Sequence, residues 1–333
     1  MKKIFAAALI AISCMLTGCA YTDYLRNHVF TATGGAVSGS PATAAPKEEE
    51  PEPPVSSVSG AGIVTADLVT ADMQKASYWI SRTMTAERMI LSPDEISEWN
   101  KKYNNETKAE SDAADNIPFL IVTGNKLSAG GKIYGMGDKI FLLTDELKER
   151  WIKEHGQEDC TDTYLADPLS FPKRSANIPI TIPVSEEVHL GYLEYTKANV
   201  LNQAFQYLGT MYLTDEEEAE DTNTEFVKRV YSCFGFNLPD KRDAYAALGD
   251  KAVDVSKMSA EEKTEKLNST EPGTLLDFSG NIGIYLGCIE QKHYAIGYFG
   301  YTCSIREITT GTPKNQPDEH TWLTDLTKIY QIN

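Results

Sequence analysis

The C-terminal part of the chain predicts helices first and an antiparallel sheet after them. Residues 196–208 carry apolar side chains at helical spacing and end before Gly209, and residues 222–234 repeat the same spacing. From residue 274 to 332 the pattern changes to the alternation of β-strands. Segregated helices and antiparallel strands are typical of an α+β fold. The expected strands are residues 282–286, 293–301 and 304–308, and a short helix is expected at 242–248.

Capping residues mark two helix starts. Within residues 66–103, where apolar residues recur at helical spacing, Ser92 fits the N-cap of a helix and Pro93 its first position. Further along, Thr222 begins the sequence TNTE, in which Thr222 fits an N-cap and Glu225 the residue that reaches back to it. We therefore expect one helix to begin after Ser92 and another after Thr222.

Between these helices, residues 117–195 predict a small β-rich region. Glycines and prolines separate its short strand-like runs, and one helix-like piece interrupts them. The runs are residues 119–122, 139–143 and 178–184, and the helix-like piece is residues 145–153. The region is long enough for one small barrel but too short for a complete pair.

The first residues have the pattern of a targeting segment, which is excluded from fold reasoning. Two lysines precede the apolar run 4–16, and the run closes with the sequence LTGC, which ends at Cys19. This sequence resembles the lipobox of bacterial lipoproteins. The resemblance implies a signal peptide at residues 1–18 and a lipid on Cys19 that anchors the protein to a membrane. Because Ala20 follows Cys19, the anchor implies the periplasmic face of the outer membrane in a diderm host. The alternative is an ordinary secretory signal with a chance cysteine.

Residues 19–65 predict a disordered tether. The stretch 31–60 is rich in Ala, Gly, Ser, Thr and Pro, and it ends near a run of glutamates and prolines. Such a composition cannot bury enough apolar surface to offset the entropy of ordering the chain. Its prolines favour an extended linker between the lipid and the folded part.

Charge and cysteine content restrict the partners and cofactors. The formal charge of −17 repels phosphate backbones, so nucleic acid is not an expected partner. No C-x-x-C or H-E-x-x-H motif occurs, so we expect no metal site and no other cofactor. The cysteines outside the signal and lipobox allow three disulfide pairings, among which the sequence does not choose. They are Cys160, Cys233, Cys288 and Cys303.

Several short motifs recur in the order and spacing of one enzyme family. They are Tyr195-Thr196, Leu208-Gly209-Thr210-Met211-Tyr212, Phe226, Phe234-Gly235, Leu238-Pro239, Gly280 and Ile284-Tyr285-Leu286-Gly287. In these residues the chain resembles the NlpC/P60 family of cell-wall cysteine peptidases, which have a papain-like fold. The resemblance implies a degenerate NlpC/P60-like domain over residues 196–333.

The most similar group within that family is the exported lipoprotein type with bacterial SH3 domains and an N-terminal stabilising segment. The sequence LSPDEI at residues 91–96, followed by Trp99 and Asn100, resembles this segment. The resemblance therefore implies a helical stabilising segment at residues 66–103 and a reduced SH3-like region at residues 117–195.

The departures from the family fall on positions that carry chemistry. Spacing places Asn223 at the position of the nucleophilic cysteine and Asn281 at that of the catalytic histidine. Gly297 falls about where the third, orienting polar residue is expected. An amide cannot attack a carbonyl as a thiolate does, and no base can activate it. The resemblance therefore implies a domain that retains its core and has lost its catalytic residues.

Four positions are candidates for ligand binding. Thr222 replaces the aspartate that in active relatives grips the free amine of a peptidoglycan stem peptide, and Asp240 replaces an arginine. Tyr212 keeps the tyrosine of its motif. Tyr298, with two neighbouring aromatic residues, either lines a remnant groove or belongs to the ordinary sheet core. The acidic run 215–221 either holds a cation or is a solvated loop.

Other residues of the region are candidates for a replacement nucleophile or base. Cys233 lies roughly 15 Å along the helix from Asn223, at about 1.5 Å per residue, near the end where the dipole opposes a thiolate. It fits a core or disulfide cysteine. Helix capping accounts for Thr222 and Thr224. His293 would serve as a base only if it faced the start of the helix.

These interpretations favour a non-catalytic envelope lipoprotein that acts as a binding or scaffolding module at the cell wall. Its expected partner is a cell-wall component or a basic envelope protein. One alternative is an active peptidoglycan endopeptidase that uses other residues, such as His293 with a threonine. Another is a structural lipoprotein whose cleft is filled. If the alignment holds, Asn223 and Asn281 face each other.

Overall fold

The computed structural model describes part of the chain, all of it C-terminal to residue 59. The described residues are 69–84, 88–104, 117–155, 162–167, 179–211, 219–239, 241–310 and 321–332. Outside them lie the predicted signal peptide and tether with Cys19, and also Cys160, Tyr212, Asp240 and the side chains of the acidic run. None of the described helices combines the length and the apolar character needed to cross a bilayer.

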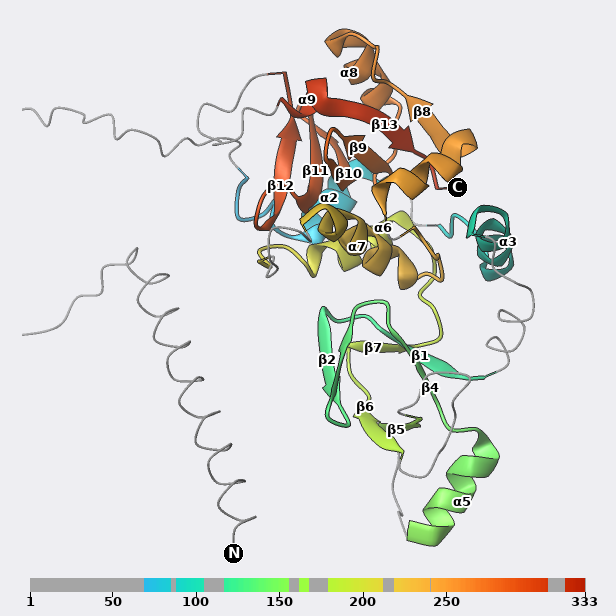
Figure 1. Cartoon of the computed structure of the whole chain (residues 1–333). Helices are drawn as coiled ribbons and strands as arrows, with labels where there is room; N and C mark the ends of the chain where they lie inside the picture. The colour runs from blue at the N-terminus through green and yellow to red at the C-terminus, as the bar shows by residue number, and fades with distance from the viewer. Residues whose placement is uncertain are drawn as a thin grey trace, which may run out of the picture. The chain divides into compact units, whose positions relative to one another are not determined.

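A six-stranded antiparallel sheet forms the centre of the C-terminal part, in the order β12-β11-β10-β9-β13-β8 (Figure 1). Neighbouring strands pair antiparallel throughout. The strands are β8 (Ala252–Asp254), β9 (Leu275–Phe278), β10 (Asn281–Ile289), β11 (Lys292–Tyr298), β12 (Cys303–Ile308) and β13 (Leu326–Tyr330). This sheet, with the helices that cover it, confirms the predicted α+β class.

Helices cover both faces of the sheet (Figure 1). On one face lie α2 (Ala76–Thr83), α6 (Lys197–Phe205) and α7 (Ala219–Ser232), whose apolar residues join those of β10 and β11 in one buried cluster. On the other face, α8 (Ala260–Asn268) and α9 (Trp322–Asp325) enclose a second cluster. The 3₁₀ helix η2 (Arg242–Lys251) leads into β8. The two clusters divide the sheet residues by the alternation of side chains along each strand.

A glycine allows α2 to approach the sheet closely. Strand β10 carries a bulge between Tyr285 and Gly287, and Gly287 has a φ of 113°. A Cβ atom at this position would lie 2.7 Å from Cγ2 of Thr83, the last residue of α2. The indole of Trp79 on the same helix is fully buried, and its Nε1–H donates to the carbonyl of Met73 at 2.7 Å. Glycine is therefore required at 287 both for conformation and for space.

Helix α3 (Pro93–Asn104) begins where the sequence predicts. The Ser92 hydroxyl accepts from the backbone N–H of Glu95, and the Glu95 carboxylate accepts from the backbone N–H of Ser92. Further along α3, the Asn100 side chain donates to the Gly235 carbonyl and accepts from the Asn237 N–H. These bonds attach α3 to the turn that follows α7.

The described part of the small β-rich region contains three short sheets and one helix. The sheets are β4-β1-β7, β2-β3 and β5-β6. Their strands are β1 (Phe119–Val122), β2 (Lys126–Ala129), β3 (Lys132–Gly135), β4 (Lys139–Phe141), β5 (Thr163–Ala166), β6 (Ile180–Pro183) and β7 (Val188–Leu190), and the helix is α5 (Asp145–His155). Ten buried residues form a separate core here, among them Leu120, Ile140 and Ile182.

One predicted helix start is wrong. Helix α7 begins at Ala219, so Thr222 lies within its first turns and is not the N-cap. The Glu225 carboxylate accepts from the Arg229 guanidinium one turn later. Helix α6 starts next to the predicted residue 196, since Thr196 is its N-cap and the Thr196 hydroxyl accepts from the Asn199 N–H. It ends at Phe205 rather than at the predicted residue 208.

Two hairpins place different residues in the same left-handed turn. Gly130 and Gly131 connect β2 to β3 with φ values of 58° and 74°. Glu290 and Gln291 connect β10 to β11 with φ values of 52° and 65°. Positive φ at both central residues is the geometry of a type I′ turn, which favours Asn-Gly. The second turn therefore carries strain that the first avoids.

We predict that replacing Glu290-Gln291 with Asn-Gly raises the free energy of unfolding by about 1 kcal/mol, because side chains in the left-handed region are unfavourable. The reciprocal control is Gly131→Ala. An added Cβ there meets no atom within 4 Å, so backbone strain alone should lower stability. Urea denaturation measures both, and an Asn-Gly variant less stable than the parent would contradict the prediction.

Candidate functional site

Two asparagine side chains are hydrogen-bonded to each other between α7 and the start of β10. The Asn223 side chain, on the second turn of α7, donates from Nδ2 to Oδ1 of Asn281, the first residue of β10, at 2.7 Å. The Oδ1 atom of Asn223 accepts from the backbone N–H of Tyr298, the last residue of β11, at 3.1 Å. The prediction that Asn223 and Asn281 face each other is confirmed.

The surroundings of Asn223 are closed. Its side chain is only 6% exposed. The ring of Tyr298 packs edge-on against Phe226 of α7, and its hydroxyl lies 2.6 Å from Oγ1 of Thr210. Thr210 in turn donates to the Tyr207 carbonyl. Tyr298, a predicted binding residue, is therefore buried in the interface between helix and sheet rather than lining an open groove. The bond to Thr210 has no signal in the sequence.

Gly297 is not brought to this pair. A Cβ atom on Gly297 would lie 3.3 Å from the ring of Phe299, which belongs to the cluster on the α8 and α9 face of the sheet. Ile296 and Tyr298, on either side of it, face α7 instead. The backbone N–H of Tyr298 thus makes the second described hydrogen bond to the Asn223 side chain, and Gly297 does not take the expected third position.

The side chains of three predicted binding residues are not among those that the structure describes. Tyr212 and Asp240 lie outside the described residues, and of Thr222 only the backbone is described. The pairings that the sequence left open for Cys160 likewise lie outside.

Comparisons with known proteins give only distant similarity. No family model and no curated protein matches the chain. One similar solved structure is an NlpC/P60 endopeptidase from Photobacterium damselae subsp. piscicida, with 15% identity, a TM-score of 0.41, and coverage of 61% of this chain and 49% of that one. Another is an NlpC/P60 family protein from Bacillus cereus ATCC 10987, with 14% identity, a TM-score of 0.40, and coverage of 67% and 66%. The chain thus spans about half of the first protein. Identities this low transfer no residue roles.

His293 lies on the wrong face of the sheet to act with α7. Its ring is 3% exposed, and Nδ1 lies 2.6 Å from the hydroxyl of Tyr285, within the cluster that α8 and α9 cover. Burial lowers the pKa of this imidazole below its ordinary value, so it is held neutral. Its Nε2 is buried without a hydrogen-bond partner among the described residues. The histidine is therefore structural and does not face Asn223.

The described cysteines are free thiols. Cys233 is fully buried, and burial raises its pKa to about 12, because the thiolate would lose its hydration. Cys303 is also buried with a raised pKa, whereas Cys288 is exposed. A core role for Cys233 agrees with this environment. Its thiol lies 3.7 Å from the Val122 carbonyl of the β-rich region.

The Asn223 side chain is a buried polar group whose hydrogen-bond partners lie within the protein. Both atoms of the Asn223 amide are engaged, and neither of its partners is a base or a nucleophile. Thr224, the neighbouring hydroxyl, is 1% exposed. No group of His, Cys, Asp or Glu residues in the described ranges could hold a metal ion. The arrangement can hold α7 against β10 and β11.

We predict that Asn223→Ala lowers the free energy of unfolding by about 1–3 kcal/mol. The substitution leaves the Tyr298 N–H and the Asn281 amide without their partner in a closed site. The matched control is Asn268→Ala at the exposed end of α8, which should change stability by less than about 0.5 kcal/mol. Chemical denaturation monitored by tryptophan fluorescence measures both, and equal effects would show that the Asn223 contacts do not matter.

Proposed function

We propose that this protein is a non-catalytic lipoprotein of the bacterial cell envelope. In this proposal its C-terminal part is a degenerate NlpC/P60-like domain that binds or scaffolds rather than cleaves. The supporting observation is the direct hydrogen bond between Asn223 and Asn281, the two residues that stand at the positions of the catalytic cysteine and histidine in the family that the sequence resembles.

Chemistry supports the loss of cleavage. A cysteine hydrolase needs a thiolate, which a helix N-terminus and a nearby imidazolium stabilise. Asn223 supplies an amide that is already bonded at both ends. Cys233 is buried with a raised pKa, and His293 packs on the other face of the sheet. None of these residues offers a substitute nucleophile or base at the site.

The N-terminal parts of the described structure fit supporting roles in this proposal. The two helices within residues 66–103 act as the stabilising segment, and residues 117–195 act as a reduced SH3-like module. Contacts to α7 support this role. The Arg229 guanidinium pairs with Asp138 and also donates to the Met136 carbonyl of the β-rich region.

The proposed partner of this module is a cell-wall component or a basic envelope protein. A chain with a formal charge of −17 attracts cationic surfaces at long range and accelerates their association. Thr222 carries no charge with which to grip the free amine of a stem peptide. A basic partner therefore suits the charge of this protein better than the stem peptide of active relatives.

We predict that the purified protein releases no product from peptidoglycan fragments under conditions in which an active NlpC/P60 endopeptidase cleaves them. Mass spectrometry of the soluble fraction measures the products. Turnover that disappears in Asn223→Ala or Thr224→Ala, and persists in Asn268→Ala, would establish the alternative of an active endopeptidase and end this proposal.

Membrane attachment is tested separately. We predict that Cys19→Ala releases the protein from the membrane fraction and abolishes labelling by a fatty-acid analogue, because the lipid on Cys19 supplies the anchor. Cys288→Ala removes an exposed thiol and serves as the control, which should stay attached and labelled. Membrane association of the Cys19 variant equal to that of the parent would refute the lipoprotein assignment.

A further inference from the structure

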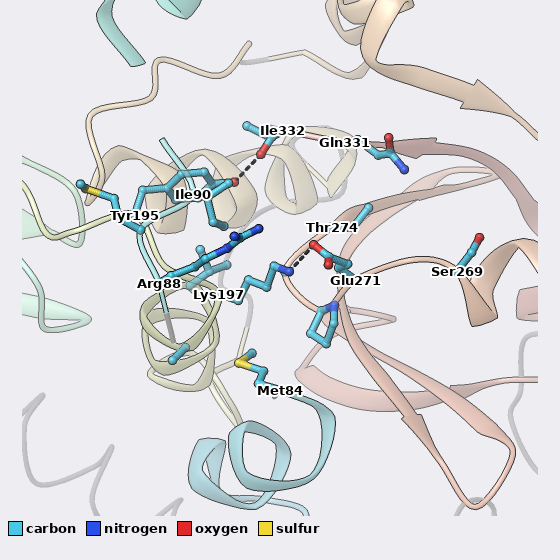
Figure 2. A pocket seen from close by; sticks show the side chains of 15 residues that line it. Met84, Arg88, Ile90, Tyr195, Lys197, Ser269, Glu271, Thr274, Gln331 and Ile332 are labelled. Carbon is cyan, nitrogen blue, oxygen red and sulfur yellow. Dashed lines mark hydrogen bonds and ion pairs between the residues drawn. The ribbon is translucent and has the colours of Figure 1, made fainter. Parts of the chain in front are cut away.

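A cavity of about 930 Å³ lies away from the Asn223 site. Four parts of the described chain line it: Met84 with residues 88–90, the start of α6, the turn before β9, and the residues after β13 (Figure 2). Neither Asn223 nor its bonding partners line the cavity. Its volume is in the range of cavities that bind small organic ligands. The inference from it does not depend on whether catalysis has been lost.

Hydrogen bonds fix the walls of this cavity. The backbone N–H of Ile90 donates to the Tyr195 carbonyl at 2.8 Å, which holds Ile90 against the residue that precedes the N-cap of α6. The hydroxyl of Tyr195, which is 3% exposed, donates to the Ile332 carbonyl at 2.7 Å. Tyr195 thus connects Ile90 and Ile332, which lie on two walls of the cavity, by hydrogen bonds within the protein.

Three charged residues line the cavity, and their charges do not cancel. Lys197 forms an ion pair with Glu271, whereas Arg88 extends into the same space and has no acidic or hydrogen-bonding partner among the described residues (Figure 2). The described lining residues therefore carry a net charge of about +1 in a chain whose formal charge is −17. A guanidinium presents a planar fork of donors that matches a carboxylate.

The rest of the lining combines apolar surface with uncharged polar groups. Met84, Ile90 and Pro272 contribute apolar walls. Among the described residues, the side chains of Thr274 and Gln331 have no hydrogen-bond partners and can serve a ligand's amide or hydroxyl groups. This lining suits a ligand with an apolar body and one charged end.

We infer that the cavity binds a small organic carboxylate with an apolar body, with the carboxylate on Arg88. A single excess positive charge favours a monoanion over a phosphate dianion, which the surrounding negative chain would repel more strongly. Two sources share this chemistry: the C-terminal carboxylate of a short peptide and a medium-chain fatty acid. The polar groups of Thr274 and Gln331 suit the peptide, and the experiment distinguishes the two.

Calorimetric titration of the full chain tests the site with two acids and their uncharged amides. The probes are N-acetyl-alanyl-leucine and octanoate, each beside the corresponding carboxamide. We expect at least one acid to bind and its carboxamide to bind roughly tenfold more weakly or not at all. Binding of the peptide acid alone identifies a peptide C-terminus, and binding of octanoate alone identifies a fatty acid. If neither acid binds, or if acid and amide bind equally, the inference is wrong.

Variants assign the binding to the cavity. Arg88→Ala should weaken the acid roughly tenfold or more, because a charge-assisted hydrogen bond is lost. Arg82→Ala is the matched control, since Arg82 is exposed on α2 and stacks over Tyr78 outside the cavity. Glu271→Gln should strengthen binding several-fold, because it removes the competing carboxylate and frees Lys197.

Thermal unfolding of each variant confirms that it is folded before titration. Unchanged affinity in Arg88→Ala, or equal losses in the Arg88 and Arg82 variants, would overturn the assignment. So would weaker binding in Glu271→Gln.

Discussion

The burial of α7 is the constraint on which the rest of the described structure depends. Six of the ten residues from Asn223 to Ser232 are buried and none is fully exposed, because β10 and β11 cover one side and the β-rich region meets the C-terminal end of the helix. A Cβ atom on Gly137 would lie 2.7 Å from the Arg229 carbonyl, and the Cys233 thiol lies against the Val122 carbonyl. A rotation of α7 about its axis would therefore disturb the sheet contacts and the β-rich region together.

Much of this fold is predictable from local sequence, because caps and apolar periodicity act over a few residues. The starts of α3 and α6 follow from Ser92 and Thr196, and the run 119–122 matches β1. The start of α7 is not predictable in the same way, since Thr222 looks like an N-cap while acidic residues before it also suit a helix N-terminus. Helix α8 is not among the predicted elements, although Ser259 and Glu262 form a capping box that its sequence signals.

In the candidate site, the spacing of motifs along the sequence predicts one side-chain contact but not the others. Counting from Phe226 and from the strand motif places Asn223 opposite Asn281, and the two are hydrogen-bonded. For Gly297 the same counting fails, because successive residues of a strand point to opposite faces and an error of one position exchanges them. The contact to Tyr298 is made by a backbone N–H, which every non-proline residue has, so no side-chain pattern could reveal it.

The Asn223 site and the cavity lined by Arg88 differ in whether their polar groups have hydrogen-bond partners within the protein. At Asn223 both the nitrogen and the oxygen of the side-chain amide have partners inside the protein, so a ligand would have to break protein hydrogen bonds to enter. In the cavity between α6 and β9, Arg88 has no partner among the described residues, and water must solvate it when the cavity is empty. An anion that displaces this water replaces weakly held solvent with a charge-assisted bond, while one that approaches the surface elsewhere meets net negative charge. Specific ligand binding is therefore favoured in the cavity, where Arg88 has no described partner within the protein. It is disfavoured at Asn223, whose side-chain amide is already hydrogen-bonded to protein groups.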